Sequence, residues 1–384
     1  MIKLLRITTV PISLKILLKG QLKFMSQHFE VIGVSAPGVE IDEVIKNEGI
    51  RCIELPMERK PSPIKDILSI IRMYILIKKE KPTIVHTHTP KAGMVGMIAS
   101  FFAKVPVRLH TVAGLPLMES KGLKFLIYKF IEKITYLCAN QVYPNSKKLA
   151  EYIVNEKIAH ESKVKVIGNG STNGIDTNYF MPKYFEDQSL IIREKLNIKT
   201  NDFIFLYIGR LVKDKGVNEM LSAFEQVLLK RKNIKLLLVG DYEEERDPIS
   251  VKSKDTIAKN ENIIMIGFQS DVRPYLSIAN CFVFPSYREG FPNVVLQAGA
   301  MEKCSIVTDI NGSNEIVIHN ETGIIVPPKD SKALYLAMEA IISDETIDCY
   351  AMGKKARERI VCLYEQQKIW ELILKEYYNC IRNV

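Results

Sequence analysis

The stretch that decides the fold is Ser286-Tyr-Arg-Glu-Gly-Phe-Pro-Asn-Val-Val-Leu-Gln-Ala-Gly-Ala-Met301, which follows the apolar run Cys281–Pro285. Together they predict a strand, a sharp loop and a helix. Gly290 lets the backbone approach a ligand closely, and Pro292 suits the first turn of a helix, whose unbonded N–H groups attract an anion. Glu289 adds a carboxylate that can accept hydrogen bonds from hydroxyl groups. The pattern favours a sugar joined to a phosphate; an ordinary Gly-Pro loop that opens a helix is the alternative.

The size of the chain and its cysteines restrict the class of protein. A chain of 384 residues, 47% of them hydrophobic, is too long for one comfortable core, so we expect two domains with a cleft between them. The seven cysteines are scattered without a CxxC pair, which predicts reduced thiols in a cytoplasmic protein, with no disulfide and no metal site. Neither a secretion signal nor a membrane-spanning apolar run is visible.

The formal net charge of +9 favours acidic partners, namely nucleotides, anionic lipid surfaces or nucleic acid. Because no nucleic-acid-binding motif is present, we expect no nucleic-acid partner. Two segments, Ile12–Met25 and Lys121–Leu137, mix lysines with large apolar residues. Each predicts either a helix that lies on an anionic membrane or a packing helix with solvated lysines. The lysines are Lys15, Lys19 and Lys23 in the first segment and Lys124, Lys129 and Lys133 in the second.

Short apolar runs alternate with segments of helical period along the first part of the chain. The predicted strands are Lys3–Val10, Phe29–Ser35, Arg51–Leu55, Ile84–His86, Val107–Val112, Gln141–Tyr143 and Val164–Ile167. The predicted helices are Leu14–Ser26, Ile41–Glu48, Ile64–Glu80, Ala92–Ala103, Phe125–Ala139 and Lys147–Val154. Such alternation is typical of a parallel sheet covered by helices on both faces, with ligands at the carboxyl ends of the strands.

A Gly- and Asn-rich stretch, Gly168–Asp176, predicts a linker, and a second alternating series follows it. Its strands are Phe203–Gly209, Lys235–Gly240, Ile263–Ile266, Cys281–Pro285, Ser305–Thr308 and Thr322–Val326, and its helices are Asn218–Lys230, Val251–Ala258, Asp271–Ala279, Asn293–Met301 and Ser331–Ser343. We therefore predict an α/β protein with two Rossmann-like, doubly wound domains, residues 1–172 and 173–360. A helical tail, 361–384, is expected to pack back toward the N-terminal domain.

Three histidines lie at predicted strand ends of the first domain. His86 and His88 alternate along one strand, so we expect that they do not face one ligand, and a metal would need a third ligand that the sequence does not show. A satisfied core histidine is the favoured interpretation of His86. His110 is the candidate for the reacting centre, because a neutral imidazole can bond a sugar hydroxyl or a phosphate oxygen and change charge near neutral pH.

Two cations stand in the predicted loop Gly209–Gly216 of the second domain. The planar fork of Arg210 and the point charge of Lys215, five residues later, fit a diphosphate, although two solvated loop cations are the alternative. At the next strand end but one, Gly267 and Phe268 offer backbone and an aromatic ring to a nucleobase.

Taken together, these motifs resemble a known family. Gly209-Arg210, Lys215-Gly216, Gly240, Gly267-Phe268 and Ser286–Asn293 resemble the donor-binding half of glycosyltransferase family 4, retaining enzymes of the GT-B fold, in which two Rossmann-like domains face each other across a cleft. The stretches His86–Gly93 and His110–Pro116 resemble acceptor-domain loops of members that build bacterial surface polysaccharides and lipid-linked glycans. The resemblance covers nearly the whole chain.

The resemblance implies roles for individual residues. Arg210 and Lys215 would hold the donor diphosphate, Glu289 would bond the sugar hydroxyls, and the backbone of Phe291–Asn293 would complete the cradle. The implied catalytic residues are His110, Arg210, Lys215 and Glu289. The implied donor-binding residues are Gly209, Arg210, Lys215, Gly240, Gly267, Phe268, Glu289, Gly290, Phe291, Pro292, Asn293 and Gln297. The implied acceptor side comprises Pro11, Lys19, His86, His88, Lys91 and His110.

The sequence departs from the family pattern at Gln297, where a second Glu usually contacts the ribose. An amide can still bond a ribose hydroxyl, so binding should survive, but a carboxylate role at this position is excluded. The stretch Met301–Cys304 likewise replaces a Gly-Pro turn.

The implied function is transfer of a hexose or N-acetylhexosamine from a nucleotide diphosphate sugar, UDP-linked, to a saccharide acceptor, lipid-linked, with retention, in capsule or other surface glycan synthesis. No cofactor and no metal is expected, and the chain has no Asp-x-Asp pair to hold one. The expected location is cytoplasmic, at the inner face of the cell membrane. A UDP-sugar 2-epimerase of the same fold and a non-enzymatic nucleotide-sugar-binding subunit are the alternatives.

Overall fold

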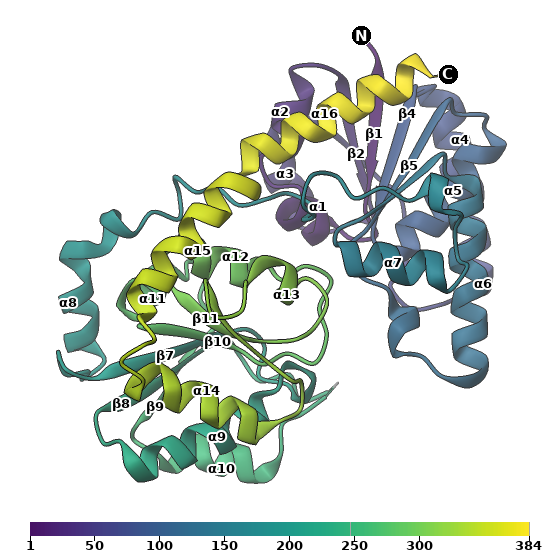
Figure 1. Cartoon of the computed structure of the whole chain (residues 1–384). Helices are drawn as coiled ribbons and strands as arrows, with labels where there is room; N and C mark the ends of the chain where they lie inside the picture. Colours follow the sequence, from purple (N-terminus) through teal and green to yellow (C-terminus); the bar gives the residue numbers. More distant parts are fainter. Residues whose placement is uncertain (246, 384) are drawn as a thin grey trace. The chain divides into compact units, whose positions relative to one another are not determined.

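The computed structural model describes residues 1–245 and 247–383, and the chain divides into two compact units (Figure 1). Unit 1 comprises Met1–Gly174 together with Gln366–Val384, and unit 2 comprises Ile175–Glu365. Each unit contains one sheet of six parallel strands. Val384, the last residue of the predicted tail, lies outside the described residues.

The sheet of unit 1 has the order β3-β2-β1-β4-β5-β6. Its strands are β1 (Lys3–Ile7), β2 (Glu30–Ser35), β3 (Arg51–Glu54), β4 (Ile84–His88), β5 (Val107–Val112) and β6 (Gln141–Pro144). Its helices are α1 (Pro11–Leu17), α2 (Gln21–Ser26), α3 (Glu40–Glu48), α4 (Pro63–Glu80), α5 (Pro90–Phe102), α6 (Gly122–Cys138), α7 (Lys147–Asn155) and α16 (Gln366–Arg382). Side chains of α4, α5, α6 and α7 share one hydrophobic cluster with the sheet, and those of α1, α2, α3 and α16 share another.

The sheet of unit 2 has the order β12-β11-β10-β7-β8-β9. Its strands are β7 (Phe203–Ile208), β8 (Ile234–Val239), β9 (Ile263–Gly267), β10 (Cys281–Phe284), β11 (Cys304–Thr308) and β12 (Gly323–Val326). Its helices are α8 (Glu186–Lys195), α9 (Val217–Lys230), α10 (Val251–Lys259), α11 (Arg273–Ile278), α12 (Asn293–Ala300), α13 (Ser313–Ile316), α14 (Ser331–Ser343) and α15 (Cys349–Leu363). Both units repeat the strand order of a doubly wound sheet, so the predicted fold class is confirmed.

Two predicted elements of unit 1 are wrong. The helix predicted over Leu14–Ser26 is two helices, because Gly20 between them is left-handed, with φ of 76°. A Cβ at Gly20 would lie 2.7 Å from the Trp370 ring, so the Trp370 side chain also leaves no room for a larger residue at this position. The strand predicted over Val164–Ile167 is absent; only Val164 forms an isolated bridge, with Val142.

The break between α1 and α2 removes the single lysine-bearing helical face predicted from Lys15, Lys19 and Lys23. Since Lys19 lies between α1 and α2, the three lysines do not line one helical face. Leu18 and Leu22 between the lysines, and Leu14 and Met25 beside them, are fully buried in the core, whereas Ile16 is 55% exposed. The segment is therefore a pair of packing helices, and Lys15 forms an ion pair with Glu43 at 2.6 Å.

The prediction that all cysteines are reduced thiols is also wrong for two of them. Cys304, at the start of β11, and Cys349, at the start of α15, are joined by a disulfide. The sulfur of Cys281, the β10 register partner of Cys304, lies within 4.8 Å of both. The two bonded cysteines are 45 positions apart, so no local spacing indicates the bond.

The last helix of the chain, α16, completes unit 1. Ile369, Ile373 and Tyr377 are buried in the same hydrophobic cluster as α1 and α2. The Trp370 indole N–H donates to Asn173 Oδ1 at 2.7 Å. None of the described helices is long and apolar enough to cross a membrane.

Candidate functional site

The loop after β10 arranges Glu289 in front of α12. The Ser286 hydroxyl donates to Glu289 Oε1 at 2.9 Å, and the Lys215 ammonium forms an ion pair with the same oxygen. Pro292 is the N-cap of α12 and Asn293 its first residue, where the helix was predicted to begin. The N–H groups of Asn293 and Val294, which lie before the first α-helical hydrogen bond, and the neighbouring ammonium make the start of α12 a site for an anion.

The loop after β11, which contains Asn311 and Gly312, supports the Glu289–Gly290 loop. This support was not predicted from the sequence. The Asn311 amide donates to the backbone carbonyls of Glu289 and Gly290, at 3.2 and 2.9 Å. Gly312 has φ of 77°, and a Cβ there would lie 2.6 Å from the Gly290 oxygen. A side chain at 312 would therefore push the Gly290 loop out of position.

Lys215 is brought to Glu289 by the contact between two strand ends. Gly216, at the N-cap of α9, has φ of 70°, and a Cβ there would lie 2.0 Å from the Pro285 carbonyl oxygen. Only glycine allows this approach of the loop after β7 to the loop after β10. In the sheet these two strands are neighbours at the point where the strand order reverses, where doubly wound sheets bind their ligands.

Arg210 follows Gly209 at the end of β7. The Tyr207 hydroxyl donates to its carbonyl at 2.7 Å, while its guanidinium is half exposed and forms an ion pair with Glu243. Glu243 lies in the loop after β8 and was not predicted. Both cations of the predicted diphosphate site are thus held by carboxylates.

The remaining donor-side residues lie along the same edge of the sheet. Gly240 has no room for a side chain, because a Cβ would be 2.0 Å from the Gly209 oxygen, and its N–H donates to Gly267 at 2.9 Å. Phe268 is 72% exposed, and its N–H donates to Asp241 at 3.0 Å. Phe291 and Pro292 are buried, whereas Asn293 is exposed and Gln297 half-buried on α12. The structure therefore brings the donor-side residues to the adjoining ends of β10, β7, β8 and β9.

In unit 1, His110 on β5 is buried beside a cavity of about 320 Å³. Its Nδ1 lies 2.8 Å from the Thr87 hydroxyl, and a Cβ at Gly93 would be 2.4 Å from the ring. Burial lowers the pKa of His110 to about 4, so the imidazole is neutral at pH 7. The prediction that it changes charge near neutral pH is therefore wrong. A neutral ring can still donate or accept a hydrogen bond.

Glu132 of α6 lines the same cavity and was not predicted from the sequence. Its side chain is buried, and burial raises the pKa of its carboxyl to about 7. The rest of the lining comes from the loop ends of β4 and β5, including Pro90, Val112 and Leu115. A carboxyl group and an imidazole that line one mainly apolar cavity can bind one hydroxyl or amide of a saccharide.

The expectation that His86 and His88 point apart is wrong. Residues two apart on a strand share a face, and the two ring centroids are 4.3 Å apart. His86 lies 2.6 Å from the Tyr377 hydroxyl and 2.7 Å from the Thr111 hydroxyl, which makes it the satisfied core histidine that the sequence favoured. His88 accepts from buried Arg6 at 3.2 Å. Burial lowers the pKa of both histidines.

The other acceptor-side candidates lie in different places. Pro11 is the buried first residue of α1, and Lys91, near the start of α5, forms an ion pair with Asp66. Their loops meet where β1 and β4 adjoin, with the hydroxyls of Thr9 and Thr89 2.7 Å apart. Lys19 is exposed at the break between α1 and α2, outside this group.

Comparison with known proteins places this geometry in a family. Residues 188–359 match the family described as glycosyl transferases group 1, and residues 15–146 match the family described as glycosyl transferase 4-like. The chain is 35% identical over 380 residues to the capsular polysaccharide biosynthesis glycosyltransferase CapM of Staphylococcus aureus, covering 98% of this chain and 97% of that protein. It is 28% identical over 392 residues to the UDP-Gal:alpha-D-GlcNAc-diphosphoundecaprenol alpha-1,3-galactosyltransferase of Escherichia coli, covering 98% of each.

Solved structures show the same fold at lower identity. A glycosyltransferase from Rickettsia africae has a TM-score of 0.82 at 22% identity, covering 100% of this chain and 99% of that chain. Anabaena Alr3699/HepE in complex with UDP and glucose has a TM-score of 0.82 at 17% identity, covering 99% of this chain and 100% of that chain.

Proposed function

Because the chain belongs to the group 1, family 4-like glycosyltransferases and has the GT-B fold, we propose that it transfers a hexose or N-acetylhexosamine from a UDP-sugar to a lipid-linked saccharide, with retention at the anomeric carbon. The observation that carries the proposal is the group of Arg210, Lys215, Glu289 and the start of α12 at one strand edge of unit 2.

The chemistry follows from the charges of this group. The barrier to transfer is the charge that develops on the diphosphate as it leaves. Arg210, Lys215 and the N–H groups of α12 stabilise that charge, and the packed loops hold Lys215 and the start of α12 in place before the donor binds. Glu289 accepts from sugar hydroxyls and orients the anomeric carbon. These groups supply the positive charge that a metal ion would otherwise supply, so we propose that the reaction needs none.

The relatives support the choice of donor and acceptor. The Escherichia coli relative is named for a UDP-galactose donor and a diphosphoundecaprenol-linked acceptor. A Campylobacter jejuni relative, 25% identical over 370 residues, is named as a diphospho-undecaprenol N-acetylgalactosaminyltransferase. An acceptor of this kind is held in a membrane, so we propose that the enzyme works as a peripheral protein on the inner face of the cell membrane.

One assay tests the proposal against its alternatives. The purified chain is incubated with labelled UDP-sugars, with and without a bacterial membrane lipid extract. Labelled lipid supports transfer, and a C2 isomer of the donor would indicate the epimerase. UDP binding without either product would indicate a binding subunit. NMR of the product tests retention, since its anomeric configuration should equal that of the donor, and EDTA should leave the rate unchanged.

A further inference from the structure

We propose that the outer faces of α4 and α6 form a docking surface for an anionic phospholipid bilayer. The surface is not the segment that the lysines at 15, 19 and 23 indicated. It consists of two apolar stripes, one on each helix, with cationic side chains beside them. The proposal deepens the proposed function, because a lipid-linked acceptor would be met at the same bilayer, but it rests on its own observations.

The stripe on α4 faces solvent although its residues are large and apolar. Ile64, Ile67, Leu68, Ile71 and Ile75 follow the helical period, and Ile64 and Ile75 are 77% and 59% exposed. The opposite side of the helix, with Met73 and Ile77, is buried in the core. This helix is therefore apolar on two sides, and only one of them is used for packing.

The stripe on α6 repeats the pattern. Leu123, Leu126, Ile127, Phe130 and Leu137 are exposed, Leu123 by 74% and Phe130 by 64%, while Glu132, Thr135 and Tyr136 on the other side are buried. Both helices pack against α5, which lies between them and ends in exposed Phe101 and Phe102. The stripes thus belong to one layer of unit 1, and contiguous exposed apolar residues of this kind mark an interaction surface.

The charges beside the stripes select the partner. On α4, Lys65, Arg72 and Lys79 recur every seven residues along one flank of the stripe, with Lys65 in an exposed ion pair with Glu58, and on α6 Lys124 and Lys133 are exposed. In these two fully described helices the carboxylates are paired or buried: Asp66 pairs with Lys91, Glu80 with Lys3 and Arg51, and Glu132 is buried. An apolar stripe with cations beside it matches the acyl boundary and headgroups of an anionic leaflet.

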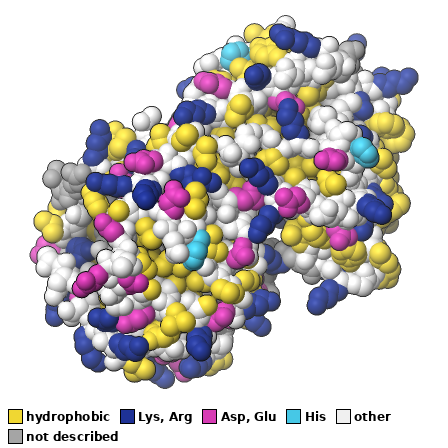
Figure 2. Space-filling view, viewed as in Figure 1, with side chains coloured by type: hydrophobic (Ala, Val, Ile, Leu, Met, Phe, Trp, Pro, Cys, Tyr) yellow, Lys and Arg dark blue, Asp and Glu magenta, His cyan; other side chains and the backbone are white. Residues whose placement is uncertain are grey.

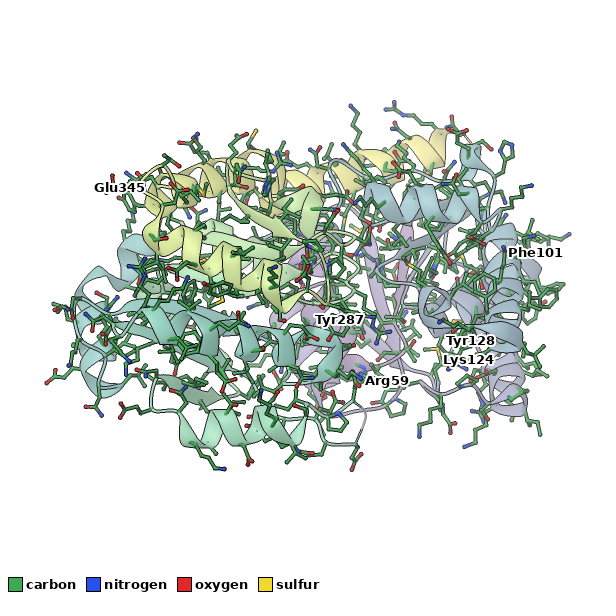
Figure 3. The ribbon with its side chains drawn as sticks, turned by 60° about the horizontal axis from the view of Figure 1, so that its bottom comes forward. Arg59, Phe101, Lys124, Tyr128, Tyr287 and Glu345 are labelled. Atoms are coloured by element: carbon green, nitrogen blue, oxygen red, sulfur yellow. A yellow bond between two sulfur atoms is a disulfide. The ribbon has the colours of Figure 1, made fainter. Side chains whose placement is uncertain are left out.

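The same layer is visible in two views. Along the edge of unit 1 where α4, α5 and α6 lie, Figure 2 shows hydrophobic side chains interspersed with Lys and Arg. Figure 3 shows Phe101 from α5 on the same side of unit 1 as Lys124 and Tyr128 from α6. A second copy of the chain is the weaker alternative, because two such faces would bring like charges together.

The test is flotation of the full chain with vesicles at low salt. Anionic vesicles should bind it and zwitterionic vesicles should bind it far less. Two variants of α4 separate the apolar contribution from the cationic one. They are Ile67→Ser/Ile71→Ser/Ile75→Ser and Lys65→Gln/Arg72→Gln/Lys79→Gln. Each should lower vesicle binding by about tenfold or more, and added salt should lower it further in the parent. Unchanged circular dichroism confirms that the variants fold.

Matched controls come from elsewhere in the chain. Lys15→Gln/Lys19→Gln/Lys23→Gln and the unit 2 variant Leu229→Ser/Val251→Ser/Leu336→Ser should bind vesicles as the parent does. Insertion is read from Phe130→Trp, whose added fluorescence should shift to the blue and be quenched by brominated lipid in anionic vesicles only.

Three results would overturn the proposal. The first is that the parent does not bind anionic vesicles. The second is that the Ile67→Ser/Ile71→Ser/Ile75→Ser variant binds them as well as the parent does. The third is that the parent is a dimer in solution and this variant is a monomer. Vesicle binding is measured without sugar, and transfer to a detergent-dispersed acceptor is measured without vesicles. The failure of one proposal is therefore distinct from the failure of the other.

Discussion

At the scale of single residues, the two cations of the donor site are already paired. Arg210 is held by Glu243 and Lys215 by Glu289. A diphosphate that binds Arg210 must displace Glu243, whereas the Lys215–Glu289 pair can persist, since Glu289 is proposed to face the sugar. The pairs hold both long side chains near the site before the donor arrives, which reduces the entropy that donor binding costs.

Arg210→Lys keeps the charge but loses the planar fork of the guanidinium. We expect kcat/KM for transfer to fall about tenfold, which corresponds to the ~1.5 kcal/mol of one charge-assisted hydrogen bond. Steady-state kinetics measure this change. Arg231→Lys is the matched control, because Arg231 pairs with Glu339 at the end of α9 and should leave the kinetics unchanged. An unaltered Arg210→Lys enzyme would remove Arg210 from the site.

Gln297 stands where the family usually has a glutamate. If its amide bonds the ribose, Gln297→Glu should be tolerated and Gln297→Leu should weaken UDP binding by about 1 kcal/mol, or roughly fivefold. Calorimetry with UDP compares the two variants. Equal affinities would show that position 297 does not touch the nucleotide.

Glu132 makes the stability of unit 1 depend on pH. Burial raises the pKa of its carboxyl from 4.5 to about 7, so the folded chain holds a proton that the unfolded chain loses. Its contribution to stability is therefore lost as pH rises from 4.5 to 7. Glu132→Gln should be more stable than the parent by up to about 3 kcal/mol above pH 7 and by little at pH 4.5.

The measurement is urea unfolding followed by the fluorescence of Trp370, the only tryptophan, which lies in unit 1. A difference between Glu132→Gln and the parent that stays constant from pH 4.5 to pH 8 would contradict the raised pKa. The lowered pKa of His110 makes the stability of both proteins rise with pH below 6.5, which opposes the effect of Glu132. The difference in unfolding free energy between Glu132→Gln and the parent removes this contribution.

At the scale of elements, α12 and α15 are held together in unit 2. The helices pack against each other, with no room for a side chain at Gly299 or at Gly353, where a Cβ would be 2.1 Å from the Glu302 carbonyl. The disulfide from Cys349 to Cys304 fixes the start of α15 beside the strand that follows α12. The support of the anion-binding helix thus includes a covalent bond.

Cys349→Ser removes that bond. The disulfide spans 45 positions, and a loop of that size is worth about 4 kcal/mol when closed. Without reductant the variant should therefore unfold at lower temperature than the parent in calorimetry, and dithiothreitol should remove most of the difference. Cys362→Ser, at an exposed cysteine outside the disulfide, is the matched control. Alkylation of all seven cysteines in the unreduced protein, after unfolding in urea, would show that the bond does not form.

At the scale of the whole molecule, unit 1 is built from both ends of the sequence. The chain leaves it after Gly174, forms all of unit 2, and returns at Gln366. The returning helix α16 covers the α1 and α2 side of the sheet with Ile369, Ile373 and Tyr377. Unit 1 therefore cannot complete its core until the last residues are made.

Ile373→Ala tests this dependence. Since Ile373 is buried in unit 1, the substitution should lower the unfolding free energy of that unit by about 2–4 kcal/mol. Trp370 fluorescence in urea measures it. Calorimetry with UDP should find unchanged affinity, because the donor-side residues lie in unit 2. A loss of UDP affinity as large as the loss of unfolding free energy would contradict the placement of the donor site in unit 2 alone.

Much of the fold and of the donor site was determined by the sequence itself. Alternating buried strands and periodic helices require only neighbours along the chain, so the strands of unit 2 were predicted within one residue of their observed ends. The loop Ser286–Asn293 and the Gly209–Gly216 loop each carry their residues contiguously, and glycines mark where the backbone must approach closely. Local steric rules are therefore enough to propose a phosphate site.

Only the tertiary structure decided which distant residues meet. Glu243 reaches Arg210, Glu132 and His110 line one cavity, and Cys349 reaches Cys304 because strand order and helix packing bring them together. None of these pairs has a spacing that indicates it in the sequence. The same holds for the lysine-rich segments. A helical period shows that a helix has two faces, but burial by the rest of the fold decides which face is left to solvent. The Ile12–Met25 segment buries most of its apolar residues and exposes Ile16 alone by more than half, whereas α4 and α6 each leave a whole apolar stripe exposed.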